Sequence, residues 1–100
     1  MTTDKASDLL AERYADFGIT KRKATNLVLK GVEKGMTVAQ GYNFARYFLS
    51  KEFGTFEKFS IDDIVCMTGL SRAKVLEKFS DGLDEMSEDE IDRYFDNNTL

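Results

Sequence analysis

The chain has 100 residues, of which 42% are apolar and 32% charged, and its net charge is -4. This length supports one domain, residues 1–100, with a modest hydrophobic core. The absence of histidine and the presence of a single cysteine, Cys66, exclude a disulfide within the chain, a tetrahedral zinc site and a histidine general base. We therefore expect no metal, no cofactor and no enzymatic activity.

The location implied by the sequence is the cytoplasm. The N-terminus lacks the charged and then apolar pattern of a signal peptide, and no apolar stretch is long enough to span a membrane. A single thiol suits a reducing compartment. These features predict a cytoplasmic protein of bacterial or phage type that does not contact membranes.

The charges are distributed unevenly along the chain. Residues 1–50 carry 8 basic and 5 acidic side chains, whereas residues 51–100 carry 6 basic and 13 acidic ones. Most of the negative excess lies in residues 80–100. An acidic isoelectric point, near 4.8, is the opposite of the basic character that phosphate binding usually requires.

Apolar residues recur every three or four positions, and this spacing predicts an all-α fold with five or six short helices. The first helix is expected from about Asp4 to Phe17, where Gly18 ends it. We expect it to bury one apolar stripe. That stripe consists of Ala6, Leu9, Leu10, Tyr14 and Phe17.

A second helix is predicted from its cap, Thr20, to about Lys34, and Gly35 stops it. Its expected buried residues are Ala24, Leu27, Val28, Gly31 and Val32. The basic residues on its solvent side are Lys21, Arg22, Lys23, Lys30 and Lys34. They are candidate phosphate contacts if the chain binds nucleic acid. The alternatives are a solvated helix face and surface pairing with the acidic C-terminal region.

A third helix is predicted from a capping box, Thr37 with Gln40, to about Phe53. This helix and the loop after it are rich in aromatic residues. They hold seven of the 12 aromatic residues, namely Tyr42, Phe44, Tyr47, Phe48, Phe53, Phe56 and Phe59. We expect these rings to form the centre of the core, and the alternative is an exposed aromatic surface for a partner.

Residues 60–79 predict two short helices joined by a tight turn. Ser60 and Asp63 form a capping box for the first, Ser71 caps the second, and Gly69 eases the turn between them. Ile64, Leu70, Val75 and Phe79 are expected to pack the two helices together. Gly82 can end the second helix of this pair.

A short last helix, capped by Ser87, is expected to reach about Phe95, and residues 96–100 are expected to fray.

This helix pair resembles the helix-turn-helix of bacterial DNA-binding proteins, and residues 68–75 are similar to the turn and the start of the recognition helix. The sequence departs from the pattern at Val65, where these families usually have alanine or glycine. The resemblance implies a transcription regulator that binds double-stranded DNA, as a homodimer when the site is symmetric. The residues that would contact DNA are Ser71, Arg72, Ala73, Lys74 and Lys78. An arginine such as Arg72 can bind guanine in a bidentate manner.

The acidic C-terminal region supports a second hypothesis, an acidic protein-interaction module or phage-type inhibitor in which the helix pair is only scaffold. The residues that would bind a basic protein partner are Asp81, Asp84, Glu85, Glu88 and Asp89. They lack the ligand order and central glycine of a calcium-binding EF-hand loop. No Walker or Rossmann glycine motif is present either. DNA binding is the leading hypothesis.

Overall fold

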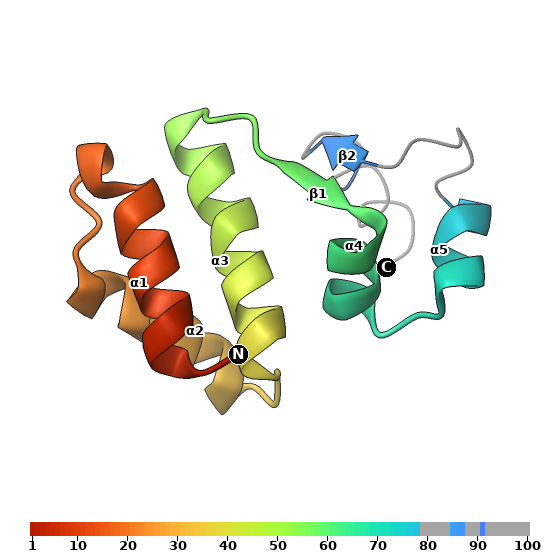
Figure 1. The fold of residues 1–100 in the computed structure, drawn as a ribbon, viewed down its shortest axis with the longest axis horizontal. Helices are drawn as coiled ribbons and strands as arrows, with labels where there is room; N and C mark the ends of the chain where they lie inside the picture. Colours follow the sequence, from red (N-terminus) through yellow and green to blue (C-terminus); the bar gives the residue numbers. More distant parts are fainter. Residues whose placement is uncertain (79–84, 88–90, 92–100) are drawn as a thin grey trace.

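The computed structural model describes residues 1–78, 85–87 and 91. This part of the chain is mainly α-helical, which confirms the predicted all-α class. The elements, in chain order, are α1 (Thr3–Arg13), the 3-10 turn η1 (Ala15–Phe17), α2 (Lys21–Glu33), α3 (Val38–Phe53), β1 (Lys58–Ser60), α4 (Ile61–Thr68), α5 (Arg72–Lys78) and β2 (Glu85–Ser87) (Figure 1).

Helices α2 and α3 begin at the capping residues predicted from the sequence, Thr20 and Thr37. The Thr20 hydroxyl accepts a hydrogen bond from the N–H of Lys23 at 3.2 Å at the start of α2. The capping box of α3 is complete, because the N–H of Gln40 donates to Thr37 at 3.1 Å and the Gln40 side chain accepts from the N–H of Thr37 at 2.9 Å. Such caps satisfy backbone donors that have no partner inside the helix.

The first helix is shorter than its apolar stripe predicted. It ends at Arg13, because Tyr14 has φ -114° and ψ 22°, outside the helical region, and the chain continues as the turn η1. Gly18, at φ 79°, closes this turn in the left-handed conformation that glycine adopts easily. The predicted burial of two residues is wrong: Phe17 is 44% exposed and Val32 is 36% exposed.

The first of two cores lies among α1, α2 and α3, which pack side by side (Figure 1). The buried residues of this core are Ala6, Leu10, Tyr14, Ala24, Val28, Ala45 and Leu49. Two glycines allow α2 and α3 to approach closely. A Cβ built on Gly31 would lie 3.1 Å from the Cα of Gly41, and one on Gly41 would lie 3.0 Å from the Val28 carbonyl oxygen.

The second core lies between the other side of α3 and the helices α4 and α5. Its buried residues are Tyr47, Phe59, Ile61, Ile64, Met67, Val75 and Ile91. Helix α3 therefore contributes to both cores, which explains why it has buried residues on two sides, seven of its 16 residues in all. The expectation of an aromatic core is confirmed for Tyr47 and Phe59 and wrong for Phe48 and Phe56, which are 60% and 74% exposed.

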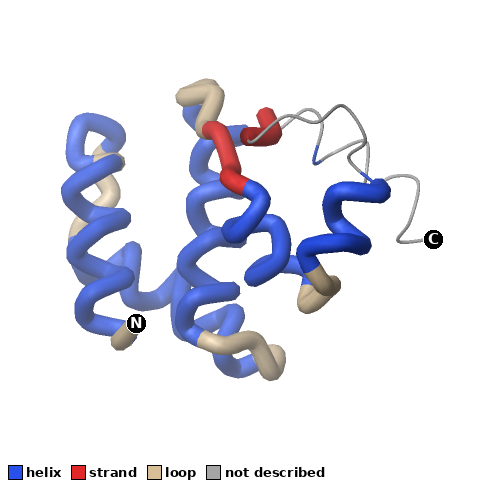
Figure 2. The backbone as a smooth tube through the Cα atoms, turned by 45° about the vertical axis from the view of Figure 1, so that its right-hand side comes forward, coloured by secondary structure: helices blue, strands red, loops and turns tan. Residues whose placement is uncertain are grey.

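Strands β1 and β2 form a short antiparallel pair, which was not predicted from the sequence. Lys58 lies opposite Ser87, and Ser60 lies opposite Glu85. Figure 2 shows the two strands next to each other. Strands of three residues are too short to show the alternation that identifies a strand in sequence. The predicted end of the fifth helix at Gly82, most of the last helix and the fraying of residues 96–100 lie outside the described residues.

Candidate functional site

The predicted helix pair is present as α4 and α5, joined by residues 69–71. Its first helix begins with the predicted capping box, since Ser60 and Asp63 exchange backbone-to-side-chain hydrogen bonds of 3.1 Å. Gly69 ends that helix at φ 72°. The Ser71 hydroxyl then accepts a hydrogen bond from the N–H of Lys74 at 3.2 Å, as expected of a cap.

The packing positions of this pair also lie where the sequence placed them. Ile64 is 1% exposed and Val75 is fully buried, and both belong to the second core. Leu70 packs against the same core. Phe79 lies outside the described residues. The pairing of the two helices is therefore observed, whereas its equivalence to a DNA-binding helix-turn-helix remains a prediction.

The residues expected to contact DNA form an exposed turn. Ser71, Arg72, Ala73 and Lys74 are all exposed, and they directly precede the buried Val75. The side chain of Lys78 lies outside the described residues. Val75 therefore anchors α5 while the preceding turn faces solvent.

Two carboxylates lie next to the cations of this turn. Nη1 of Arg72 lies 2.8 Å from Oδ1 of Asp62, which belongs to the first turn of α4. Nζ of Lys74 lies 3.9 Å from Oε2 of Glu77. Exposed pairs of this kind contribute about 0 to 1 kcal/mol to stability.

The five basic residues of α2 do not form one patch. Nζ of Lys21 lies 2.6 Å from Asp4 and 3.2 Å from Asp8, both on α1, and these hydrogen bonds raise the pKa of Lys21 above its ordinary value. Lys23 donates to the carbonyl of Gly18 at 3.4 Å. Arg22 is exposed, Lys30 and Lys34 line a hollow against α3, and Lys30 also lines a second hollow together with Lys23. Helix α2 packs on α1 and α3, whereas α5 packs on α4, so α2 and the α5 turn are separate surfaces.

The acidic residues proposed to bind a partner lie almost entirely outside the described residues. Asp81, Asp84, Glu88 and Asp89 belong to that group, and only the backbone of Glu85 is placed, in β2. In residues 1–78, 85–87 and 91, no three His, Cys, Asp or Glu side chains are arranged to hold a metal ion.

A buried ionic cluster between the two cores was missed in the sequence. Arg46, only 7% exposed, donates from Nε to Glu57 at 2.9 Å and from Nη1 to Asn43 at 2.9 Å. Its Nη2 donates to the Lys58 carbonyl at 3.1 Å, and Arg13 also pairs with Glu57. The only sequence signal was the helical spacing of Asn43 and Arg46, three residues apart.

This cluster is satisfied internally and connects elements that are distant in sequence. The Arg46 guanidinium lies 4.6 Å from the centre of the Phe59 ring, a favourable cation–π distance. Across the described part of the chain, every buried side-chain nitrogen and oxygen has a hydrogen-bonding partner. Because the buried polar atoms of this cluster already have partners within the protein, we assign the cluster a structural role.

Comparisons of the chain with known protein families, curated proteins and solved structures give no match. None of the helices in the described ranges combines the length and apolar character needed to cross a lipid bilayer.

Proposed function

We propose that this protein is a small, non-catalytic cytoplasmic regulator that binds double-stranded DNA through the first turn of α5. The observation that carries this proposal is the exposed turn from Ser71 to Lys74, held in place by the buried Val75. In this arrangement Arg72 contacts a base edge, and Lys74 and Ser71 contact phosphates. A homodimer would present two such turns to a symmetric site.

The charge balance supports this proposal once the chain is divided at the end of α5. Residues 1–78 carry 13 basic and 10 acidic side chains, a net charge of +3. Residues 79–100 carry 1 basic and 8 acidic side chains, a net charge of -7. The acidic isoelectric point therefore reflects the last 22 residues and not the segment that contains the helix pair.

The test is a titration of fluorescently labelled genomic duplex fragments at several salt concentrations. Wild type is compared with Arg72→Ala and Lys74→Ala, and Lys5→Ala, on α1, is the matched control for loss of one exposed positive charge. We expect Arg72→Ala to weaken binding about 5- to 150-fold at the preferred site, which corresponds to roughly 1 to 3 kcal/mol. Lys74→Ala should weaken binding to all sequences and reduce its salt dependence. Absence of binding even at low salt would reject the proposal.

The second candidate is recognition of a basic protein by the acidic residues. The observation in its favour is the net charge of -7 on residues 79–100. A neutralised protein, in which four acidic residues are replaced by the corresponding amides, separates the two functions. The substitutions are Asp81→Asn, Asp84→Asn, Glu88→Gln and Asp89→Asn. On the DNA hypothesis the neutralised protein binds duplex more tightly, because repulsion of phosphate falls. On the protein hypothesis it loses affinity for a lysine-rich peptide, and neither form binds DNA.

A further inference from the structure

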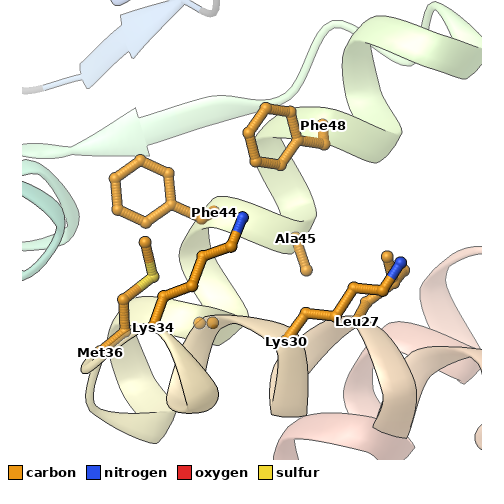
Figure 3. A pocket seen from close by; sticks show the side chains of 9 residues that line it. Leu27, Lys30, Lys34, Met36, Phe44, Ala45 and Phe48 are labelled. Atoms are coloured by element: carbon orange, nitrogen blue, oxygen red, sulfur yellow. The ribbon is translucent and has the colours of Figure 1, made fainter.

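A groove lies between α2 and α3, on a surface separate from the α5 turn. Its first hollow has a volume of about 140 Å³. Figure 3 shows Phe44 and Phe48 projecting from α3 on one side, and Lys30 and Lys34 rising from α2 on the other. Met36 and Leu27 complete the apolar lining. The hollow therefore has an apolar interior and a positively charged rim.

A second hollow extends this groove along the same two helices. It has a volume of about 270 Å³, shares Leu27 and Lys30 with the first, and adds Lys23 and Leu49. Together the two hollows follow α2 from Lys23 to Lys34. At 1.5 Å per residue this span is about 16 Å, the length of a three-turn helix.

The periodicity of α2 explains why Lys23, Lys30 and Lys34 line one groove, whereas Lys21 pairs with α1. Lys23, Leu27, Lys30 and Lys34 follow spacings of four, three and four residues, so they share one face of the helix. Phe44 and Phe48 are one turn apart on α3, with ring centres 6.5 Å apart. Figure 3 shows Lys30 and Lys34 on the α2 side of the first hollow and Phe44 and Phe48 on the α3 side.

Two glycines are among the residues that line the groove. Gly31 and Gly41 line the first hollow at the closest approach of α2 and α3. Phe48, which also lines this hollow, is 60% exposed. An exposed aromatic ring beside an apolar hollow is typical of a surface that a partner covers.

We propose that this groove binds an acidic amphipathic helix of a partner protein. The first hollow is close in volume to a cavity of about 150 Å³ that can hold a benzene ring, so it accommodates one large apolar side chain. Lys30 and Lys34 are one turn apart and match two carboxylates spaced four residues apart on the partner helix. Glu52 is the one carboxylate among the residues lining the two hollows. Charge complementarity therefore favours an acidic occupant, and this inference is independent of the proposed DNA contact.

The test uses a displayed library of three-turn helical peptides. Apolar positions vary among Leu, Phe and Ala, and flanking positions vary between Glu and Lys. Against the wild-type protein we expect enrichment of peptides with Glu at the flanks and Leu or Phe at a central position. Against the Lys30→Glu/Lys34→Glu protein we expect the flanking preference to change to Lys, because the rim charge is reversed.

Individual enriched peptides are then titrated by fluorescence anisotropy. Phe48→Ala should weaken binding at least tenfold, whereas Leu76→Ala, the matched truncation of an exposed apolar residue on α5, should not change it. Both substitutions remove exposed atoms, so unchanged circular dichroism and urea midpoints establish that the variants are folded. DNA binding by Phe48→Ala should equal that of wild type.

Three results would overturn the proposal. The first is no enrichment on wild type relative to Phe48→Ala, and the second is a flanking preference that the lysine reversals leave unchanged. The third is a concentration-dependent dimer, detected by sedimentation, that Phe48→Ala abolishes. That result would make a second copy of this chain the occupant.

Discussion

Arg72 of α5 donates a hydrogen bond of 2.8 Å to Asp62 of α4, and this contact links the two helices of the proposed DNA-binding pair at their surface. The two side chains are 58% and 87% exposed, so the pair adds about 0 to 1 kcal/mol to stability. On the proposed function its larger consequence concerns binding, because the Asp62 carboxylate would then compete with DNA for the same guanidinium.

The first prediction is that Asp62→Asn increases affinity for duplex DNA. The amide cannot hold Arg72 as a carboxylate does, and it no longer repels phosphates, so we expect binding about 3- to 30-fold tighter at low salt. Duplex titration measures the change, and Asp16→Asn, on the distant turn η1, is the control for the added charge. Equal gains in the two variants would show that only net charge matters, and no gain in Asp62→Asn would contradict a role for Arg72.

Structure that depends on neighbouring residues could be predicted from the sequence. The caps at Thr20, Thr37 and Ser60 each use a hydrogen bond between residues three apart, and all three are observed. The end of α1 was predicted less well. The apolar stripe continues through Tyr14 to Phe17, but the backbone leaves the α-helical conformation at Tyr14.

Features that depend on contacts distant in sequence could not be predicted in this way. The pairing of β1 with β2 joins residues 58–60 to residues 85–87. The burial of Arg46 depends on Glu57, Lys58 and Phe59, which reach it only after α3 ends and the chain returns. An arginine in a helix is usually exposed, and the spacing of Asn43 and Arg46 does not by itself indicate that Arg46 is buried. The candidate DNA contacts could be predicted because they lie within one short sequence motif. The groove could not be predicted, because it forms only where α2 and α3 pack against each other.

The second prediction concerns the buried pair of Arg46 and Glu57. Replacing Arg46 with Met leaves the Glu57 carboxylate, 7% exposed, with Arg13 as its remaining cationic partner, and also leaves Asn43 without its guanidinium donor. We expect a loss of about 3 to 5 kcal/mol of unfolding free energy. Urea denaturation measures it. Arg72→Met serves as the exposed counterpart and should change stability by less than about 1 kcal/mol; equal losses would contradict a structural role for the Arg46 cluster.

The third prediction concerns the close approach of α2 and α3. In Gly41→Ala the new Cβ would lie 3.0 Å from the carbonyl oxygen of Val28, a backbone atom that cannot rotate away. Alanine favours a helix over glycine by about 1 kcal/mol, but overpacking costs about 1 to 3 kcal/mol, so we expect a net loss of stability. Thermal unfolding measures the change. A variant more stable than wild type would show that the helices separate at little cost.

The fourth prediction is a loss of stability in alkaline solution. Burial raises the pKa of Tyr14 above its ordinary value of 10.0, Glu57 raises this pKa further, and the hydrogen bond to Thr55 lowers it in part. The folded protein therefore retains this proton where the unfolded chain releases it, so stability falls as pH rises above about 10. The raised pKa of Lys21 acts in the same direction, because its charged pairing with Asp4 and Asp8 is lost when the pH passes its folded-state pKa.

Tyr14→Phe isolates the contribution of the phenol, since both proteins retain Lys21. Urea midpoints measured from about pH 9 to about pH 11 should fall less steeply for Tyr14→Phe than for wild type. Parallel curves would show that the ionisation of Tyr14 is not linked to folding.

The most direct measurement is the affinity of the whole chain for labelled genomic duplex, recorded at several salt concentrations for wild type, Arg72→Ala and the control Lys5→Ala. If the first turn of α5 contacts DNA, wild type binds with an affinity that falls as salt rises, Arg72→Ala loses about 5- to 150-fold at the preferred site, and Lys5→Ala remains close to wild type. Absence of duplex binding at low salt, or binding that Arg72→Ala and Lys5→Ala affect equally, would contradict DNA recognition by α5.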